Sequence, residues 1–311
     1  MGDRSEPVSI SPTVKVGPAL LGGLPPEVRK PAYDRSALRP GIAHIGVGAF
    51  HRCHQAEYTD DLLADDFDRW GLVGINIRPP VLAETLGRQD GLYTRLIRQN
   101  NEIEARVIGS IVRVVDSQQS AAPALEVLAS PDIEMVTMTV TEKGYCHIPS
   151  SGALDLDHPD IVHDLANPEA PRSVPGILAR ALELRMGSHG RPVTLLSCDN
   201  IPANGTILST VVQTFAERRG NGLADWIAAN VAFPSAMVDR IAGRVPRWDR
   251  IGAAFVDDVT PFEHLKMRVL NGAQTTLSYL GVLGGFEHTS DAMADPLLAT
   301  FVRRMLTEET L

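Results

Sequence analysis

A short apolar stretch that ends in a glycine turn places the strongest constraint on the fold. Residues 42–47 are apolar and rich in β-branched side chains, and Gly48 and a helical pattern over 50–63 follow them. A second apolar run at 71–77 completes a strand–helix–strand unit of ordinary span. The sequence therefore predicts an α/β fold in which Gly46 and Gly48 connect the first strand to its helix.

The rest of the chain divides into an early mixed part and a late helical part. Further strands are predicted at 92–97, 105–115, 134–140 and 193–197, and further helices at 121–129, 174–185, 206–218 and 223–231. Polar residues between the first two of these strands, at 99–102, predict a hairpin. Alternating strands and helices followed by helices alone indicate a sheet domain joined to a helical one.

The clearest helix start lies in the late part. Thr260 is a candidate N-cap, Pro261 suits the first helical position, and Glu263 completes a capping box. The helix is predicted to run to about Leu283, where two glycines stop it, and a last helix is predicted over 291–306.

Composition excludes several classes of function. Lys and Arg number 29 against 38 Asp and Glu, and the net charge of −9 argues against nucleic acid as a partner. No apolar run approaches the roughly 20 residues of a membrane helix. The first residues lack an apolar signal core, so a cytoplasmic location is expected. The 3 cysteines are widely spaced and form neither a disulfide framework nor a zinc motif.

The glycine turn is a candidate dinucleotide site. A strand–glycine–helix turn presents bare backbone N–H groups to a pyrophosphate. His51 occupies the position of the usual third glycine, so a plain strand–helix turn is an equal alternative. No acid follows the second strand to bind the ribose hydroxyls. Arg78 stands there instead, compatible with the 2′-phosphate of NADP and equally with a solvated surface arginine.

Several motifs accompany this turn in a fixed order. They are 46–55, 58–63, 139–146, 197–200 with 204–205, 233–234 with 237–240, and Lys266 with 270–272. Together they resemble the long-chain mannitol dehydrogenase family, which includes mannitol 2-dehydrogenases and fructuronate reductases. The resemblance covers residues 40–310. It implies a Rossmann-like dinucleotide-binding domain at 39–247 and the start of an all-helical substrate domain at 248–311. Residues 1–38 hold many Pro, Gly and Ser without a sustained period and are predicted to form an N-terminal arm.

The resemblance also implies an activity. Family members transfer a hydride reversibly between NAD(P) and a secondary alcohol of a sugar alcohol or sugar acid, without a metal. NAD is the expected cofactor, with NADP open. Mannitol/fructose and mannonate/fructuronate are the expected substrate pairs. Many family members are monomers, and the oligomeric state of this chain stays open.

Site residues follow from the matched motifs. The family's base matches Lys266, its oxyanion donors match Asn200 and Asn271, a carboxylate near the substrate matches Asp239, and one on a proton path matches Glu263. The cofactor-binding positions are Gly46, Gly48, Ala49, Phe50, Arg78, Thr141 and Lys143. A lysine acts as a base near neutral pH only when burial lowers its pKa. Outside the family context, Lys266 is a solvated helix lysine and Glu263 only a capping acid.

Three departures from the family pattern favour a second hypothesis. Gln274 replaces a histidine, and glutamine binds a substrate hydroxyl but cannot carry a proton. The connection at 241–247 is a few dozen residues shorter than in the family, and the chain stops at Leu311. A truncated remnant that binds at most a dinucleotide is therefore the alternative. A third hypothesis is a metal hydrolase built on His51, Cys53 and His54.

Overall fold

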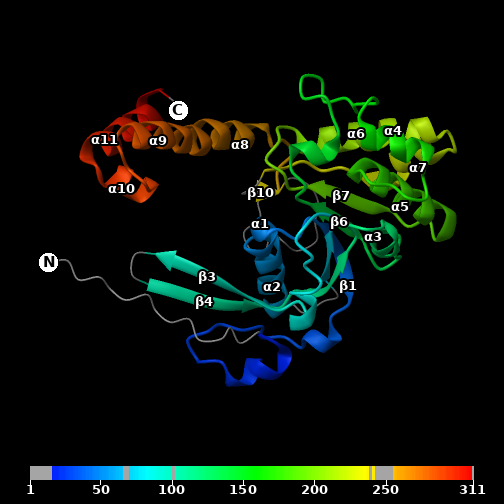
Figure 1. Cartoon of the computed structure of the whole chain (residues 1–311), viewed down its shortest axis with the longest axis horizontal. Coiled ribbons are helices and arrows are strands. Elements are labelled where there is room, and N and C mark those ends of the chain that lie inside the picture. The colour runs from blue at the N-terminus through cyan, green and yellow to red at the C-terminus, as the bar shows by residue number, and fades with distance from the viewer. Residues whose placement is uncertain (1–15, 66–69, 100–101, 238–239, 242–254, 310–311) are drawn as a thin grey trace.

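A parallel sheet forms the centre of the computed structural model, which describes residues 16–65, 70–99, 102–237, 240–241 and 255–309. Its strands lie in the order β5-β2-β1-β6-β7-β8, all paired in parallel (Figure 1). Their bounds are Pro40–Ile45 (β1), Gly71–Asn76 (β2), Ile111–Asp116 (β5), Met135–Met138 (β6), Val193–Ser197 (β7) and Val231–Ala232 (β8). Numbered by chain order within the sheet, this is the 3-2-1-4-5-6 order of the Rossmann fold. The predicted fold class is confirmed.

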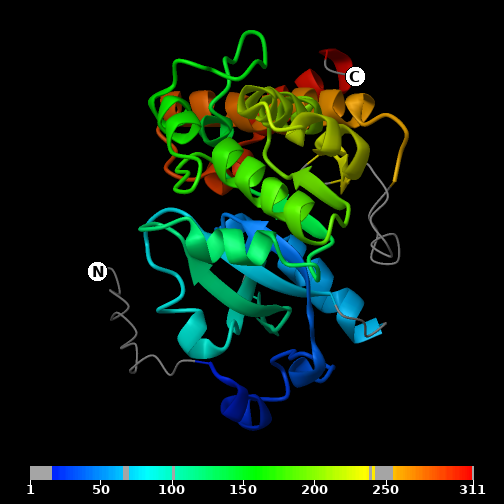
Figure 2. The same cartoon turned by 90° about the vertical axis from the view of Figure 1, so that its right-hand side faces the viewer.

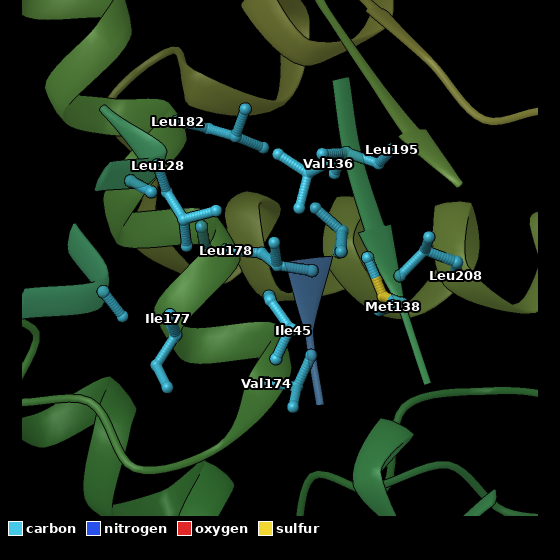
Figure 3. Close-up of a cluster of buried hydrophobic side chains, with 14 of the residues drawn as sticks. Ile45, Leu128, Val136, Met138, Val174, Ile177, Leu178, Leu182, Leu195 and Leu208 are labelled. Atoms are coloured by element: carbon cyan, nitrogen blue, oxygen red, sulfur yellow. The ribbon is translucent and has the colours of Figure 1, made fainter. Parts of the chain in front are cut away.

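Helices cover both faces of the sheet, because strands buried on both sides need two apolar layers. One face packs against α3 (Ala122–Leu128), α5 (Val174–Ser188) and α6 (Asn204–Arg219). Figure 3 shows this core, with Ile45, Met138 and Leu195 of the strands meeting leucines of those helices. The other face packs against α2 (Gln55–Asp65), which follows the short α1 (Ala49–Arg52).

The chain leaves this pattern between β2 and β5. Here β3 (Tyr93–Gln99) pairs in antiparallel register with β4 (Glu102–Ile108), so the predicted hairpin is confirmed. The prediction of one strand over 105–115 is wrong. Gly109 donates its N–H to Asp60 Oδ1 at 2.8 Å and Ser110 donates its hydroxyl to the Ala56 carbonyl at 2.6 Å. These contacts with α2 interrupt the strand and send β5 into the parallel sheet beside β2.

Helices α4 (Pro159–Ala166) and α7 (Leu223–Asn230) complete the sheet domain. The sequence pattern predicted α7 but missed α4, whose start is capped by the His158 side chain. Figure 2 shows the N-terminal half of the chain, in blue and cyan, below the green, yellow and red C-terminal half. Two-residue strands β9 (Ala236–Met237) and β10 (Arg240–Ile241) pair near the end of this domain. The predicted domain boundary at residue 247 lies outside the described residues.

A helical arm follows the sheet domain (Figure 1). It consists of α8 (Thr260–Leu265), the π-helical segment η6 (Lys266–Asn271), α9 (Gly272–Leu283), α10 (Thr289–Ala294) and α11 (Pro296–Arg304). The predicted stop after Leu283 is confirmed. The predicted single helix over 291–306 is wrong, because Asp295 caps a new helix by accepting the N–H groups of Leu297 and Leu298.

The predicted capping box at the start of this arm is also wrong. Val259 precedes the first helical residue, and the Thr260 N–H donates to Asp258 Oδ1 at 2.9 Å. Glu263 is therefore available for another contact. None of the described helices is long and apolar enough to cross a membrane.

Buried charges attach the β3–β4 hairpin to α2. Arg106 donates to Asp60 Oδ2 at 2.6 Å and to Glu57 Oε1 at 3.2 Å, and the side chains of Arg106 and Asp60 are each 2% exposed. Tyr33 from the N-terminal segment donates its hydroxyl to Asp60 Oδ1 at 2.5 Å. Asp60 thus connects the N-terminal segment before β1, the helix α2 and the β3–β4 hairpin.

We predict that Arg106→Met destabilises the protein by about 3–5 kcal/mol, because it leaves the buried Asp60 carboxylate without its cation. Urea unfolding followed by circular dichroism measures the free energy of unfolding. The control is Arg113→Ala, which removes an exposed pair with Glu126 and should change that free energy by less than about 1 kcal/mol. Equal effects of the two substitutions would contradict a structural role for the buried pair.

Candidate active site

A cavity of about 220 Å³ opens at the carboxyl edge of the sheet. Residues that follow β1, β2 and β6 line it, among them Gly46, Gly48, Arg78, Thr139 and Thr141. The chain leaves β1 toward β2 on one side, whereas β6 lies on the other side of β1, so the strand order reverses at this point. In open α/β sheets, ligands bind at such switch points.

Gly46 allows β1 and β6 to approach closely at this edge. Its φ is +93°, and a Cβ there would lie 2.1 Å from the Thr139 carbonyl oxygen. Only glycine fits this conformation and this contact. Among the described residues, a Cβ at Gly48 would meet only the Gly46 carbonyl oxygen, at 3.9 Å. The turn therefore leaves backbone accessible from the cavity, as a bound pyrophosphate requires.

The remaining cofactor candidates differ in position. Arg78 and Thr141 line the cavity, whereas Ala49, Phe50 and Lys143 are exposed and are not among its lining residues. The structure thus brings four of the seven predicted cofactor residues around one cavity.

Asp116, at the end of β5, is an acid near this cavity that sequence reasoning missed. It accepts from the Asn76 amide at 2.6 Å and from the Ala83 N–H at 2.6 Å, and thereby shapes the loop after β2. Burial raises its pKa, but these hydrogen bonds outweigh burial and hold the pKa below its ordinary value. A carboxylate at the end of a neighbouring strand has no local sequence signal, because strand order is not visible in the sequence.

Asp199 connects the cavity to a second cluster of predicted residues. Its carboxylate accepts the Val140 N–H at 3.0 Å, the Thr141 N–H at 2.9 Å and the Tyr145 hydroxyl at 2.7 Å. Thr141 has a φ of +65°, a strained value for a β-branched residue. Asp199 stabilises this strained loop, and the next residue is Asn200. The motif contained Asp199, but nothing in the sequence showed what its carboxylate contacts.

Lys266 and Asn200 meet across the two parts of the chain. The Lys266 amine donates to Asn200 Oδ1 at 2.6 Å. Glu263, one turn earlier, accepts the Ala203 N–H at 3.1 Å instead of capping its own helix. These residues line a small cavity of about 20 Å³ together with Asp199 and Met237. The Lys266 side chain is half-buried, so the full burial expected for a lysine base is only partly present.

Asn271 and Gln274 lie further along the arm. The Asn271 amide donates to Met267 Sδ at 3.0 Å, and Gln274 is exposed. Neither lines the Lys266 cavity. The π-helical segment η6 spans Lys266–Asn271, and its hydrogen bonds run from i to i+5. It therefore places Asn271 nearer the face of Lys266 than an α-helix of 3.6 residues per turn would. Asp239 lies outside the described residues.

The metal-hydrolase hypothesis finds no support in the described part of the chain. His51 is buried and contacts Gln55 Oε1 at 3.2 Å, whereas Cys53 is exposed. Burial lowers the pKa of His51 to about 3. Within the described residues, no three His, Cys, Asp or Glu side chains lie close enough to hold a metal.

The sheet order and the glycine turn at its switch point define a Rossmann-fold protein. A family model described as the mannitol dehydrogenase Rossmann domain matches residues 40–271, and one described as the mannitol dehydrogenase C-terminal domain matches residues 258–311. The chain therefore belongs to the mannitol dehydrogenase family, and the predicted resemblance is confirmed.

Individual relatives of known name support the same family assignment. The D-mannonate oxidoreductase of Escherichia coli is 38% identical over 86% of this chain and 64% of its own length. The mannitol 2-dehydrogenase of Cereibacter sphaeroides is 36% identical over 91% of this chain and 68% of its own. A Pseudomonas fluorescens mannitol 2-dehydrogenase, solved with NAD and D-mannitol, superposes with a TM-score of 0.85 at 34% identity over 96% of this chain and 69% of that one. The chain spans about two thirds of the length of these relatives.

We predict that Asp199→Asn destabilises the protein by about 1–3 kcal/mol, because an amide offers one acceptor oxygen where two backbone N–H groups and a hydroxyl need partners. Thermal unfolding of both proteins measures the change. Tyr145→Phe is the matched control: it removes one hydroxyl donor and leaves both backbone N–H contacts intact. A larger loss of stability for Tyr145→Phe than for Asp199→Asn would contradict the role given to the carboxylate.

Proposed function

We propose that this chain binds a nicotinamide dinucleotide at the carboxyl edge of its sheet and transfers a hydride reversibly to or from a secondary alcohol of a sugar alcohol or sugar acid. The contact between Lys266 and Asn200 is the observation that carries the proposal. This contact places the Lys266 amine against the Asn200 amide. Asn200 directly follows Asp199, whose carboxylate holds the Thr141 loop of the dinucleotide cavity.

The residues present fit a dinucleotide. Gly46 and Gly48 leave the turn open to a pyrophosphate, and the cavity lies at the switch point of the sheet. When bound, the nicotinamide supplies the hydride or accepts it.

The side chains of the second cluster handle the proton. With a nicotinamide bound to take the C–H hydride, the neutral Lys266 amine would take the carbinol O–H proton in the oxidation direction. Asn200 Oδ1 orients the amine by accepting one of its N–H groups, and the Asn200 Nδ2 group is left to donate to the developing alkoxide. Glu263, fixed by the Ala203 N–H, stands one turn from Lys266 as the proposed next proton carrier.

The substrate is proposed as a class. Relatives named mannitol 2-dehydrogenase and D-mannonate oxidoreductase support mannitol/fructose and mannonate/fructuronate equally. Asn271, Gln274 and Asp239 remain proposed substrate-binding residues. A small-molecule partner is proposed with them. The cytoplasmic location remains a prediction, and the oligomeric state stays open.

NAD is the proposed cofactor, because the structural neighbour was solved with NAD. The chain lacks an acid directly after β2 and exposes Arg78 at the cavity, which favours acceptance of a 2′-phosphate as well. We predict that Arg78→Ala raises the KM for NADPH several-fold and leaves the KM for NADH within about twofold. Steady-state kinetics with both cofactors measures this. A larger effect on NADH than on NADPH would contradict contact between Arg78 and the 2′-phosphate.

The proton-transfer role of Lys266 has a direct test. We predict that Lys266→Ala lowers kcat for reduction of fructose or fructuronate by at least about 100-fold, the usual contribution of a positioned general acid or base. The dissociation constant for NADH, measured by fluorescence titration, should change little. Arg268→Ala is the control, since this exposed cation lies two residues away on the same helix.

The alternative hypothesis gives a different result. A remnant that only binds a dinucleotide would bind NADH but show no turnover with either substrate in the unsubstituted protein. Gln274, which cannot carry a proton, is one of the three departures that favour this hypothesis.

A further inference from the structure

A buried histidine on the first strand lies directly beneath the glycine turn. His44, in β1, is 0% exposed and belongs to none of the residues assigned to the reaction. Its ring Nδ1 lies 2.6 Å from Thr137 Oγ1, and its Nε2 lies 3.0 Å from Thr139 Oγ1 and 3.2 Å from the Gly46 carbonyl oxygen. The same ring stacks on His51 with centroids 3.5 Å apart.

The partners of His44 fix its tautomer. The Gly46 carbonyl only accepts, and Thr139 already donates its hydroxyl to that carbonyl at 2.8 Å. Both contacts at Nε2 therefore need a proton on Nε2. Nδ1 is then left as the acceptor of the Thr137 hydroxyl. Every polar group in this chain of contacts has a complementary partner when the ring is neutral.

Burial favours this neutral form. It lowers the pKa of His44 well below the ordinary value, and the neighbouring His51 ring lowers it further. In the part of the chain that the structure describes, His51 has a hydrogen-bond partner at one ring nitrogen only: its Nδ1 lies 3.2 Å from Gln55 Oε1, and Gln55 donates in turn to Cys198 Sγ at 2.8 Å. Among the described residues, no carboxylate is hydrogen-bonded or ion-paired to either ring.

The Gly46 carbonyl is the point on which these contacts converge. It accepts from Thr139 Oγ1, from the Gly48 N–H at 2.7 Å and from His44 Nε2. These three donors fix the orientation of the Gly46 carbonyl and of the peptide that follows it. A flip of this peptide would break all three contacts and change the shape of the glycine turn.

We infer that His44 is a positioning residue for the cofactor: its neutral Nε2–H tautomer, acting with the Thr139 hydroxyl, holds the Gly46 carbonyl so that the glycine turn can receive a dinucleotide pyrophosphate. The inference rests on the proposed cofactor site. It assigns a function to two side chains that have no part in the proposed hydride and proton transfers.

Substitutions at both partners test it in the full-length chain. Thr139→Val removes the bridging hydroxyl and Thr139→Ser retains it. We expect Thr139→Val to weaken NADH binding by about fivefold to tenfold, in keeping with the loss of one net hydrogen bond, and Thr139→Ser to bind within about twofold of the original. His44→Phe should weaken NADH binding by at least as much as Thr139→Val while keeping a ring to stack on His51. His44→Gln, which restores an N–H donor, should recover part of the affinity.

The dissociation constant for NADH is measured by fluorescence titration well below the melting temperature of each variant. Adenosine serves as a second ligand, because it lacks the pyrophosphate and should bind all variants alike. A purely structural role would lower the melting temperature and leave the dissociation constant unchanged, and that result would overturn the inference. If the unsubstituted chain binds neither NADH nor NADPH, the proposed function fails first.

Nuclear magnetic resonance of ¹⁵N-labelled histidine gives an independent reading, because the two ring nitrogens of a neutral imidazole have distinct shifts in each tautomer. We expect a protonated Nε2 and an unprotonated Nδ1 for His44 at neutral pH. The opposite tautomer, or an imidazolium, would overturn the inference even if the variants bind NADH weakly.

Discussion

The close approach of the Gly46 and Thr139 backbones governs the functional edge of this protein. A Cβ at Gly46 would lie 2.1 Å from the Thr139 oxygen, so the ends of β1 and β6 can meet there only because the residue is glycine. The strand order reverses at the same place. One backbone contact therefore positions the turn, opens the cavity and sets where the next loop, 139–141, begins.

From that edge, polar contacts extend to the helical arm. The Asp199 carboxylate accepts a hydrogen bond from the backbone N–H of the strained Thr141. The next residue, Asn200, accepts a hydrogen bond from the Lys266 amine. The glycine turn and the lysine thus belong to one continuous set of contacts, although about 220 residues separate Gly46 from Lys266 in the sequence. The same edge carries the buried pair of His44 and His51 below the turn, where burial keeps both rings neutral.

Features with a local signal were predictable from the sequence. β1, its glycine turn, the β3–β4 hairpin and the stop after Leu283 follow from apolar period and turn residues. Features that depend on distant partners were not. Contacts of Gly109 and Ser110 with α2 interrupt the chain between β4 and β5. The Glu263 carboxylate accepts the Ala203 N–H instead of capping its own helix.

The candidate site shows the same division. Family motifs named Lys266 and Asn200, and the structure brings them into contact. Asp199, Asp116 and His44 were not assigned a role, because their partners lie on strands far away in the sequence. The π-helical turn after Leu265 also had no signal, although it changes the face on which Asn271 lies relative to Lys266.

A crystal structure of the full chain soaked with NADH tests the central claim most directly. We predict pyrophosphate density on the backbone of Gly46–Gly48 and the nicotinamide ring beside Asn200 and the Lys266 amine. Dinucleotide density elsewhere on the chain, or a nicotinamide ring out of reach of Lys266, would contradict the proposed active site.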